Sequence, residues 1–312
     1  MQVFNSINDL TKNKNTILTL GTFDGIHPGH LKIIDKLVSC SKEKGCRNVV
    51  ITFHPHPRTV LSGSSSVKML STQEEKINLL RKHGVENLLT INFTKEFASL
   101  TAEEFIYDYL INGIGLSEIV LGHDHHFGKG RSGNVELLKM IGAKENFIVT
   151  TAEPFLIDGE VVSSTKIRNA ISEGDVAKAN KLLGRNYSFS GVVVGGDKRG
   201  RELGFPTANI KLSSQEKLLP ASGIYAVKVF VENENHIGLL SIGNRPTFYN
   251  EGELVTEVYI YDFNREIYSK EVTTELVERL RGEEKFNSAE ELINQMNKDK
   301  ENGLKIFNKL NN

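Results

Sequence analysis

The feature that most constrains the fold is an alternation of short apolar runs and longer amphipathic segments, beginning near Asn15 and ending near Thr151. The apolar runs are too short to be helices, so we predict strands over residues 17–20, 49–53, 88–93, 119–121 and 147–151. The segments between them have helical periodicity and cover residues 31–44, 73–83, 102–111 and 135–141. Two of these helices have the capping-box spacing at their starts, Thr72 with Glu75 and Thr101 with Glu104. Strands that alternate with helices pair in parallel, so we predict a Rossmann-like α/β domain with a parallel sheet.

The pattern changes after Ser164. Two short helical stretches, 166–172 and 176–183, lead to Gly184. The following β-like runs, punctuated by Gly, Pro and Asn, cover residues 190–194, 208–212, 224–231, 237–242, 255–261 and 271–280. Short strands with turn signals predict a small antiparallel β-barrel, and the pattern over 289–310 predicts a terminal helix. A length of 312 residues is typical of two domains, and we divide the chain into 1–185 and 186–312.

Charge and composition exclude several classes of partner. The 38 Lys and Arg residues nearly balance the 39 Asp and Glu residues, so no global basic field favours nucleic acid or an anionic membrane. The chain has no apolar run of about 18 residues, and its polar first 14 residues lack the apolar region of a signal peptide. The spacing of Cys40 and Cys46 indicates neither a disulfide nor a Cys metal site. We therefore expect a cytoplasmic protein in a reducing compartment, a monomer or weak homo-oligomer, with no nucleic-acid or membrane partner.

The loop after the first predicted strand has the character of a phosphate site. It reads GTFDGIHPGH over residues 21–30, with glycines that let the backbone approach a ligand closely. Pro28 suits the first turn of a helix, so His27 and His30 would lie at a helix N-terminus, where free N–H groups attract phosphate. Such imidazoles can donate hydrogen bonds to charge developing at a phosphorus. Carboxyl ends of parallel strands are also where ligands bind in sheets of this type.

Three further segments surround the same expected edge. HPHPR at 54–58 is either a rigid turn or an anion contact, and GHDHHFGKGRSG at 122–133 has the glycines and cations of a loop around phosphates or a polar ligand. Most of the nine histidines lie in these loops, but no HExxH occurs and the cysteines are elsewhere, so a transition metal is disfavoured. SSTKIR at 163–168 starts a helix; Ser164 could be only a cap, whereas Lys166 and Arg168 indicate a second phosphate contact.

The β-rich part contains a second constellation. GGDKRGRELGFPTAN at 195–209 combines a glycine-rich flap and three cations with Thr207 and Asn209, which offer oxygen ligands on one side of a strand to a hard cation such as Mg²⁺. No Walker A sequence is present, so a P-loop kinase is excluded. Glycine and proline at barrel corners would explain Gly204 and Pro206 equally well. Glu257 projects from a predicted strand and is either a solvated residue or a general base.

These motifs carry a family resemblance. GTFDGIHPGH resembles the HxGH signature of the nucleotidyltransferase superfamily, in which ATP is attacked at its α-phosphorus. Together with GHDHHFGKGRSG and SSTKIR it resembles the FMN adenylyltransferase module of prokaryotic bifunctional FAD synthetases. GRELGFPTANI, SIGNRPTF, the strand with Glu257 and LRGEEKF at 280–286 resemble the riboflavin kinase module of the same enzymes. The resemblance covers nearly the whole chain.

The resemblance implies two ATP-dependent reactions: riboflavin is phosphorylated to FMN with release of ADP, and FMN is adenylylated to FAD with release of pyrophosphate. Mg²⁺ is the implied cofactor, held in the kinase by Thr207 and Asn209. Three residues are implied to be catalytic, namely His27, His30 and Glu257. Flavin contacts are implied for His56, Pro57, Phe127, Arg131 and Arg281. Nucleotide and phosphate contacts are implied for Gly21, Phe23, Asp24, Gly25, Asp124, Ser163, Ser164, Thr165, Arg168, Gly196, Lys198, Gly200, Arg201 and Gly204.

The chain departs from the family pattern at four positions, which affects flavin affinity and flap dynamics rather than the proposed catalytic groups. These positions are Gly195, His125, Tyr259 and Ser269. Two rival interpretations are an adenylyltransferase for another mononucleotide with a degenerate barrel, and a non-enzymatic flavin sensor that binds nucleic acid. The intact PTAN and Glu257 argue against the first, and the near-neutral charge argues against the second.

Overall fold

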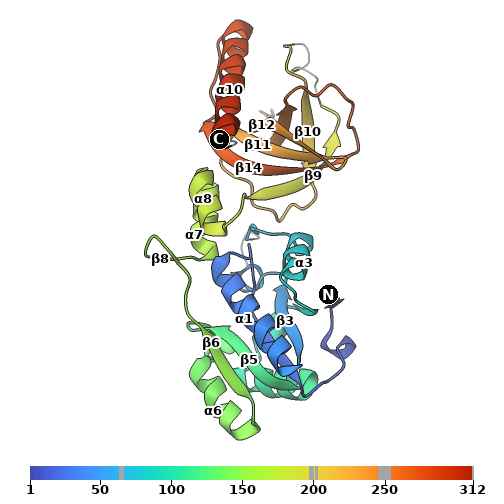
Figure 1. Cartoon of the computed structure of the whole chain (residues 1–312), viewed down its shortest axis with the longest axis vertical. Coiled ribbons are helices and arrows are strands. Elements are labelled where there is room, and N and C mark those ends of the chain that lie inside the picture. Colours follow the sequence, from blue (N-terminus) through green and yellow to red (C-terminus); the bar gives the residue numbers. More distant parts are fainter. Residues whose placement is uncertain (63–66, 197–199, 201–202, 245–253, 311–312) are drawn as a thin grey trace. The chain divides into compact units, whose positions relative to one another are not determined.

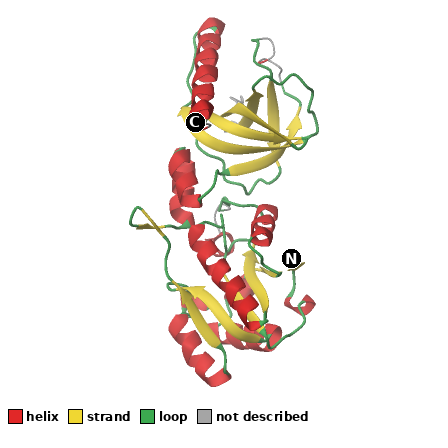
Figure 2. Ribbon diagram, viewed as in Figure 1, coloured by secondary structure: helices red, strands yellow, loops and turns green. Residues whose placement is uncertain are grey.

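The structure is a computed structural model that describes residues 1–62, 67–196, 200, 203–244 and 254–310 (Figure 1). Contacts divide the chain into two compact units, Met1–Ser164 and Thr165–Asn312. Figure 2 shows that the first unit mixes helices and strands, whereas the second contains a barrel and a long helix. Each unit is described by itself below.

The first unit is built on a six-stranded, fully parallel sheet in the order β1-β4-β3-β2-β5-β6, which confirms the predicted α/β class. The five predicted strands are present with slightly different ends. The sequence pattern missed β1, a three-residue edge strand, because three residues are too few to show a period. The strands are β1 (Gln2–Phe4), β2 (Thr16–Leu20), β3 (Arg47–His54), β4 (Asn87–Asn92), β5 (Leu116–Gly122) and β6 (Ile148–Ala152), with a β7–β8 hairpin (Leu156–Ile157 and Glu160–Val161).

The helices of this unit follow the predicted segments closely. Both capping boxes are present, at Thr72 with Glu75 and at Thr101 with Glu104. The segment predicted as one helix from 102 to 111 is a short α-helix that continues as a π-helix and ends before Gly115. The helical elements are η1 (Ile7–Asp9), α1 (Pro28–Lys44), α2 (Pro57–Ser62), α3 (Gln73–Lys82), α4 (Lys95–Ala98), α5 (Ala102–Glu104), η2 (Phe105–Ile114), η3 (Lys129–Arg131) and α6 (Val135–Glu145).

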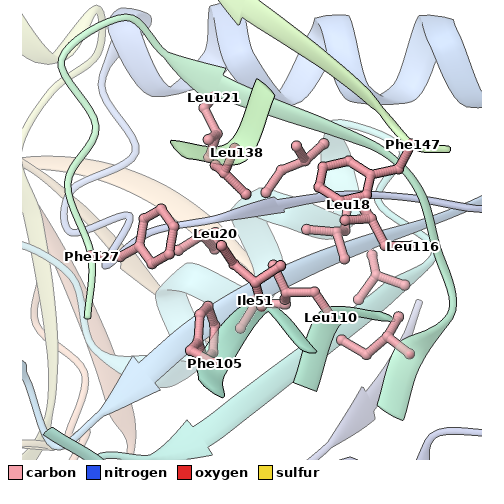
Figure 3. Packing of buried hydrophobic residues seen from close by; sticks show 14 of the residues in the cluster. Leu18, Leu20, Ile51, Phe105, Leu110, Leu116, Leu121, Phe127, Leu138 and Phe147 are labelled. Carbon is pink, nitrogen blue, oxygen red and sulfur yellow. The ribbon is translucent and has the colours of Figure 1, made fainter. Parts of the chain in front are cut away.

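Both faces of the sheet are buried, each in its own hydrophobic cluster. Because side chains alternate along a strand, Leu18 and Leu20 join one cluster and Ile17 joins the other. The first cluster packs against residues of η2 and α6, and Figure 3 shows Leu110 and Leu138 beside the strand residues. The second cluster is closed by residues of α1 and α3. Helices therefore cover both faces of the sheet, and the loops that follow the strands lie at its carboxyl edge.

The second unit contains the predicted antiparallel barrel, and it is closed in the order β10-β13-β12-β11-β14-β9. Alternate residues fill its interior, for example Tyr225, Val227 and Val229. Two helices precede the barrel and one follows it. The elements are α7 (Ser164–Glu173), α8 (Val176–Leu183), β9 (Ser188–Val194), β10 (Thr207–Leu212), β11 (Gly223–Val231), β12 (Glu234–Asn244), β13 (Leu254–Ile260), β14 (Glu271–Arg281) and α10 (Ala289–Leu310).

Side-chain hydrogen bonds attach α8 to the barrel. The Asn180 amide donates to the Leu276 carbonyl of β14 at 2.9 Å, and its oxygen accepts from the Tyr187 N–H at 2.7 Å. α8 therefore packs with the barrel, in the unit that begins at Thr165.

Ion pairs and close packing hold α10 to the barrel. Arg281 donates to both carboxylate oxygens of Asp299 at 2.8–3.1 Å, and the Tyr261 hydroxyl donates to the Lys300 carbonyl at 2.7 Å. A Cβ on Gly303 would lie 2.7 Å from Leu239, so only glycine permits this approach of the helix. The terminal helix is thus an integral part of the second unit.

Candidate functional site

In the first unit the loop after β2 brings the two predicted catalytic histidines together. His27 is the N-cap of α1 and Pro28 is its first residue, as the sequence predicts. The His30 N–H donates to His27 Nδ1 at 3.4 Å, and the two rings stack with centroids 3.7 Å apart. His27 is buried, and Gly29 leaves room for its ring, because a Cβ there would lie 3.1 Å from it. Two imidazoles beside helix N–H groups form a site suited to a phosphate.

Asp24, predicted as a nucleotide contact, is 1% exposed and holds a neighbouring segment of the first unit. Its carboxylate accepts the N–H groups of Leu70 and Ser71 at 3.1 and 3.0 Å. The Ser71 hydroxyl accepts the Gly25 N–H at 3.0 Å. Asp24 therefore fixes the shape of the loop that leads to the histidines, and its contact with the nucleotide stays a prediction.

Gly21 and Phe23, which are also predicted to contact the nucleotide, lie in the same loop. Gly21 has the Phe23 ring beside it, 3.2 Å from where a Cβ would lie. The Phe23 ring in turn meets the His30 ring edge-on at 5.3 Å. Phe23 is buried, so its ring packs against His30 and does not face solvent.

The SSTKIR segment starts α7 as predicted. The Ser164 hydroxyl donates to the Asp24 carbonyl at 2.9 Å, which joins this segment to the histidine loop. Ser163 precedes the helix and is half-buried. Thr165 and Arg168 belong to the second unit, and their contacts with phosphate stay predictions.

The predicted flavin residues of the first unit lie in two loops. His56 accepts the Arg58 N–H through Nδ1 at 3.1 Å, and Pro57 starts α2 directly after β3. Phe127 is buried in the hydrophobic cluster, and its ring centroid lies 5.9 Å from that of Phe105. Figure 3 shows both rings among the clustered side chains. Of the polar residues in the second loop, Asp124 and Arg131 are exposed. Flavin contact stays a prediction for His56, Pro57, Phe127 and Arg131, and contact with the nucleotide stays a prediction for Asp124.

His125 has the most unusual environment in this loop. Its ring stacks with that of Phe127 with centroids 6.1 Å apart, and among the residues that the structure describes its buried Nε2 has no hydrogen-bond partner. Burial lowers the pKa of the imidazole to about 4, so the ring is neutral near pH 7. The sequence marks His125 only as a departure from the family pattern and gives no sign of this burial.

In the second unit the strand register brings three oxygen-bearing side chains together. Asn209 of β10 pairs directly with Glu257 of β13, and the Thr207 hydroxyl donates to the Glu257 carboxylate at 3.2 Å. All three are half-buried. Because side chains alternate along a strand, they lie on one face of the barrel wall, and the buried Ile210 and Val258 lie on the other face. A hydroxyl, an amide oxygen and a carboxylate in one place fit the oxygen preference of Mg²⁺.

Glycines of the flap lie against these groups. A Cβ on Gly196 would lie 2.6 Å from Cγ of Asn209, and one on Gly200 would lie 3.2 Å from the Thr207 hydroxyl. Gly204 has φ 83°, in the left-handed region that favours glycine. Lys198 and Arg201 lie outside the described residues.

A cavity of about 260 Å³ adjoins Thr207. Pro206 and the segment 263–268 form much of its wall, and Tyr259, paired opposite Thr207, packs edge-on against Phe205 at 5.7 Å. Sequence reasoning did not single out 263–268, because this polar loop has no motif. Just beyond it Ser269, noted as a departure, has φ 63°, where glycine is easier to accommodate.

Arg281, predicted to lie near the flavin, forms an ion pair with Asp299 of α10 in this structure. Its guanidinium is 15% exposed and pairs with Asp299, which is 6% exposed. It also lies 5.8 Å from the Phe286 ring. A contact with flavin stays a prediction. Within the described part of the chain, no group of three or more His, Cys, Asp or Glu side chains could hold a metal ion.

Known proteins match both halves of the chain. Residues 9–166 match the FAD synthetase family and residues 183–307 match the riboflavin kinase family. The bifunctional riboflavin kinase/FMN adenylyltransferase of Listeria monocytogenes is 40% identical over 297 residues, covering 95% of this chain and 94% of the relative. The chain belongs to this bifunctional family. The relative from Bacillus subtilis is 39% identical, over 95% and 93% of the two chains, and that from Escherichia coli K12 is 33% identical over 98% of both.

A solved structure has the same overall fold. It is titled a macrolide-efflux protein from Streptococcus pneumoniae and matches with a TM-score of 0.88 and 33% identity over 96% of this chain and 97% of that one. The described residues of the present chain include no helix that is both long and apolar enough to span a bilayer.

Proposed function

We propose that this family member makes FAD in two steps: it phosphorylates riboflavin with ATP to give FMN and ADP, and then adenylylates FMN with ATP to give FAD and pyrophosphate. The observation that carries the proposal is that each unit has its own cluster of side chains whose chemistry suits phosphate or its divalent ion. The stacked histidines belong to the first unit, and Thr207, Asn209 and Glu257 belong to the second. The sequence-based division at 185/186 is retained as a functional division between the two activities.

In the adenylylation step a phosphate oxygen of FMN attacks the α-phosphorus of ATP, and the bond to the bridging oxygen breaks to release pyrophosphate. His27 and His30 hydrogen-bond to the oxygens on which negative charge develops. Helix α1 adds its free N–H groups at the same place. Gly21, Phe23, Asp24 and Gly25 shape this loop. Contacts further along the nucleotide are assigned to Asp124, Ser163, Ser164, Thr165 and Arg168.

In the kinase step Glu257 takes the proton from the ribityl 5′-hydroxyl of riboflavin. The hydroxyl oxygen attacks the γ-phosphorus of ATP, and ADP leaves. Thr207 and Asn209 hold the divalent ion. When bound, Mg²⁺ neutralises the charge of the phosphates. The flap residues Gly196, Lys198, Gly200, Arg201 and Gly204 cover the nucleotide, and Arg281 lies near the flavin. In the first unit His56, Pro57, Phe127 and Arg131 are assigned to FMN.

A turnover assay tests the proposal. The purified chain is incubated with riboflavin, ATP and Mg²⁺, and FMN and FAD are resolved chromatographically. Both products should form in that order. If FMN forms without FAD, only the kinase activity stands. If FAD forms only when FMN is added, only the adenylyltransferase activity stands. If neither product forms, the proposal is refuted. We place the enzyme in the cytoplasm as a monomer or weak homo-oligomer that needs no membrane or nucleic acid.

A further inference from the structure

A buried lysine lies beneath the histidine loop of the first unit. Lys76 is on α3 and is 6% exposed, although lysines on amphipathic helices normally reach solvent. A buried ammonium group must be matched by hydrogen-bond acceptors or charges, or it would destabilise the fold. The partners of Lys76 therefore indicate what the residue does.

Those partners belong to the ends of the two central strands. Lys76 Nζ donates to the Thr22 carbonyl at 2.8 Å and lies 3.2 Å from the Thr52 hydroxyl. The Thr52 hydroxyl also donates to the Thr22 carbonyl, at 3.1 Å. Thr22 follows Gly21 at the carboxyl end of β2, and Thr52 lies in β3. The ammonium group thus fixes the first peptide of the loop that carries the histidines.

The same segment of chain holds the loop at its other end. Ser71, five residues before Lys76, accepts the Gly25 N–H, and the Ser71 N–H donates to Asp24. Between these points Phe23 has φ 46°, and directly after them Ile26 has φ 38°. Residues other than glycine adopt this region only when their surroundings impose it. Residues 70–76 therefore clamp a strained turn that ends one residue before His27.

We propose that Lys76 is a positioning residue for adenylyl transfer: by holding the Thr22 carbonyl it sets the path of the turn and so the place of His27 and His30. The inference rests on the proposed function. It assigns Lys76 no contact with substrate. Its effect comes through the backbone, so losing it should displace the histidines while leaving substrate-binding groups in other loops unchanged.

Lys76→Met tests this role because methionine fills similar space without a donor. The kcat for FAD formation should fall about tenfold to hundredfold, since displacements near 1 Å cost about that much, while the KM for FMN changes little. Lys76→Arg, which keeps a donor, should recover at least half of the loss on a logarithmic scale. Lys82→Met, an exposed lysine on the same helix, is the matched control and should behave as wild type.

Riboflavin phosphorylation by the same purified proteins is assigned to the other unit and should stay near the wild-type rate, and thermal unfolding followed by circular dichroism shows whether the first unit is folded. A kcat loss below about tenfold, a parallel loss of kinase activity or no recovery with arginine would overturn the proposal. If Lys76→Met does not fold, Lys76→Gln, whose shorter side chain moves the donor away from the Thr22 carbonyl, is judged instead; unchanged adenylylation would then refute the role. A wild-type chain that makes no FAD refutes the proposed function itself, which is a distinguishable result.

Discussion

A methyl group added to Gly196 should disable the kinase through a steric effect on Asn209, the residue proposed above to bind the divalent ion. The Cβ would lie 2.6 Å from Cγ of Asn209, whereas ordinary van der Waals contact begins near 3.4 Å. The Asn209 side chain must therefore move by about 1 Å, and a misplacement of that size can cost about a hundredfold in rate. The loss should fall on the kinase, because Asn209 pairs with Glu257 at that site.

The assay measures initial rates of FMN formation by Gly196→Ala over a range of Mg²⁺ concentrations. We expect kcat/KM for ATP to fall by about a hundredfold and the Mg²⁺ concentration for half-maximal rate to rise. Conversion of added FMN to FAD should be unchanged, because that reaction is assigned to the other unit.

Gly195→Ala is the matched control, since a Cβ there would meet no atom of the described residues within 4 Å. It should retain the wild-type kinase rate. A Gly196→Ala enzyme whose kinase rate is within about threefold of wild type would refute the reasoning that Asn209 must keep this position. Equal losses in both variants would point to backbone entropy instead of the steric contact.

Three further outcomes are expected. Glu257→Gln should slow FMN formation by about 10²- to 10⁴-fold and spare adenylylation, whereas His30→Ala should do the reverse; loss of both activities in either folded variant would contradict the two-site assignment. Asp299→Ala leaves the Arg281 guanidinium, which is 15% exposed, without its main carboxylate partner. It should destabilise the second unit by about 3 kcal/mol, the lower end of the range for breaking a buried pair, measured by urea unfolding with the exposed Lys298→Ala as control. The folded chain holds the pKa of His125 near 4, below its ordinary value of 6.5. Because the unfolded chain then binds the proton first, stability should fall as pH drops from about 6.5 toward 4, and His125→Gln should lessen that fall.

Local signals in the sequence predicted most of the fold. Pro28 marks the start of α1, and Thr72 and Thr101 mark the starts of α3 and α5, because capping depends on residues only a few positions apart. The strands were found because two-sided burial makes them continuous apolar runs. The π-helical hydrogen bonding of η2 could not be predicted in this way, since its apolar periodicity is that of an ordinary helix.

Features that depend on distant residues were not predictable. Lys76 has the sequence context of an exposed helical lysine, and its burial depends on contacts with Thr22 and Thr52, which lie 54 and 24 positions away. The pairing of Asn209 with Glu257 likewise depends on strand register. The candidate residues were identified from motif resemblance, whereas the contacts that hold them in place came only from the structure.

The hydrogen bonds of Asn180 determine how much of the chain can be transplanted as a block. A fragment beginning at Ser188, the first residue of β9, would remove both Asn180 and Tyr187 and so deprive the Leu276 carbonyl and the Leu276 N–H of their partners. Each buried backbone group left without a partner costs about 1–3 kcal/mol. The smallest portable piece that keeps these bonds includes α8 as well as the barrel, so a chimera should be joined ahead of that helix.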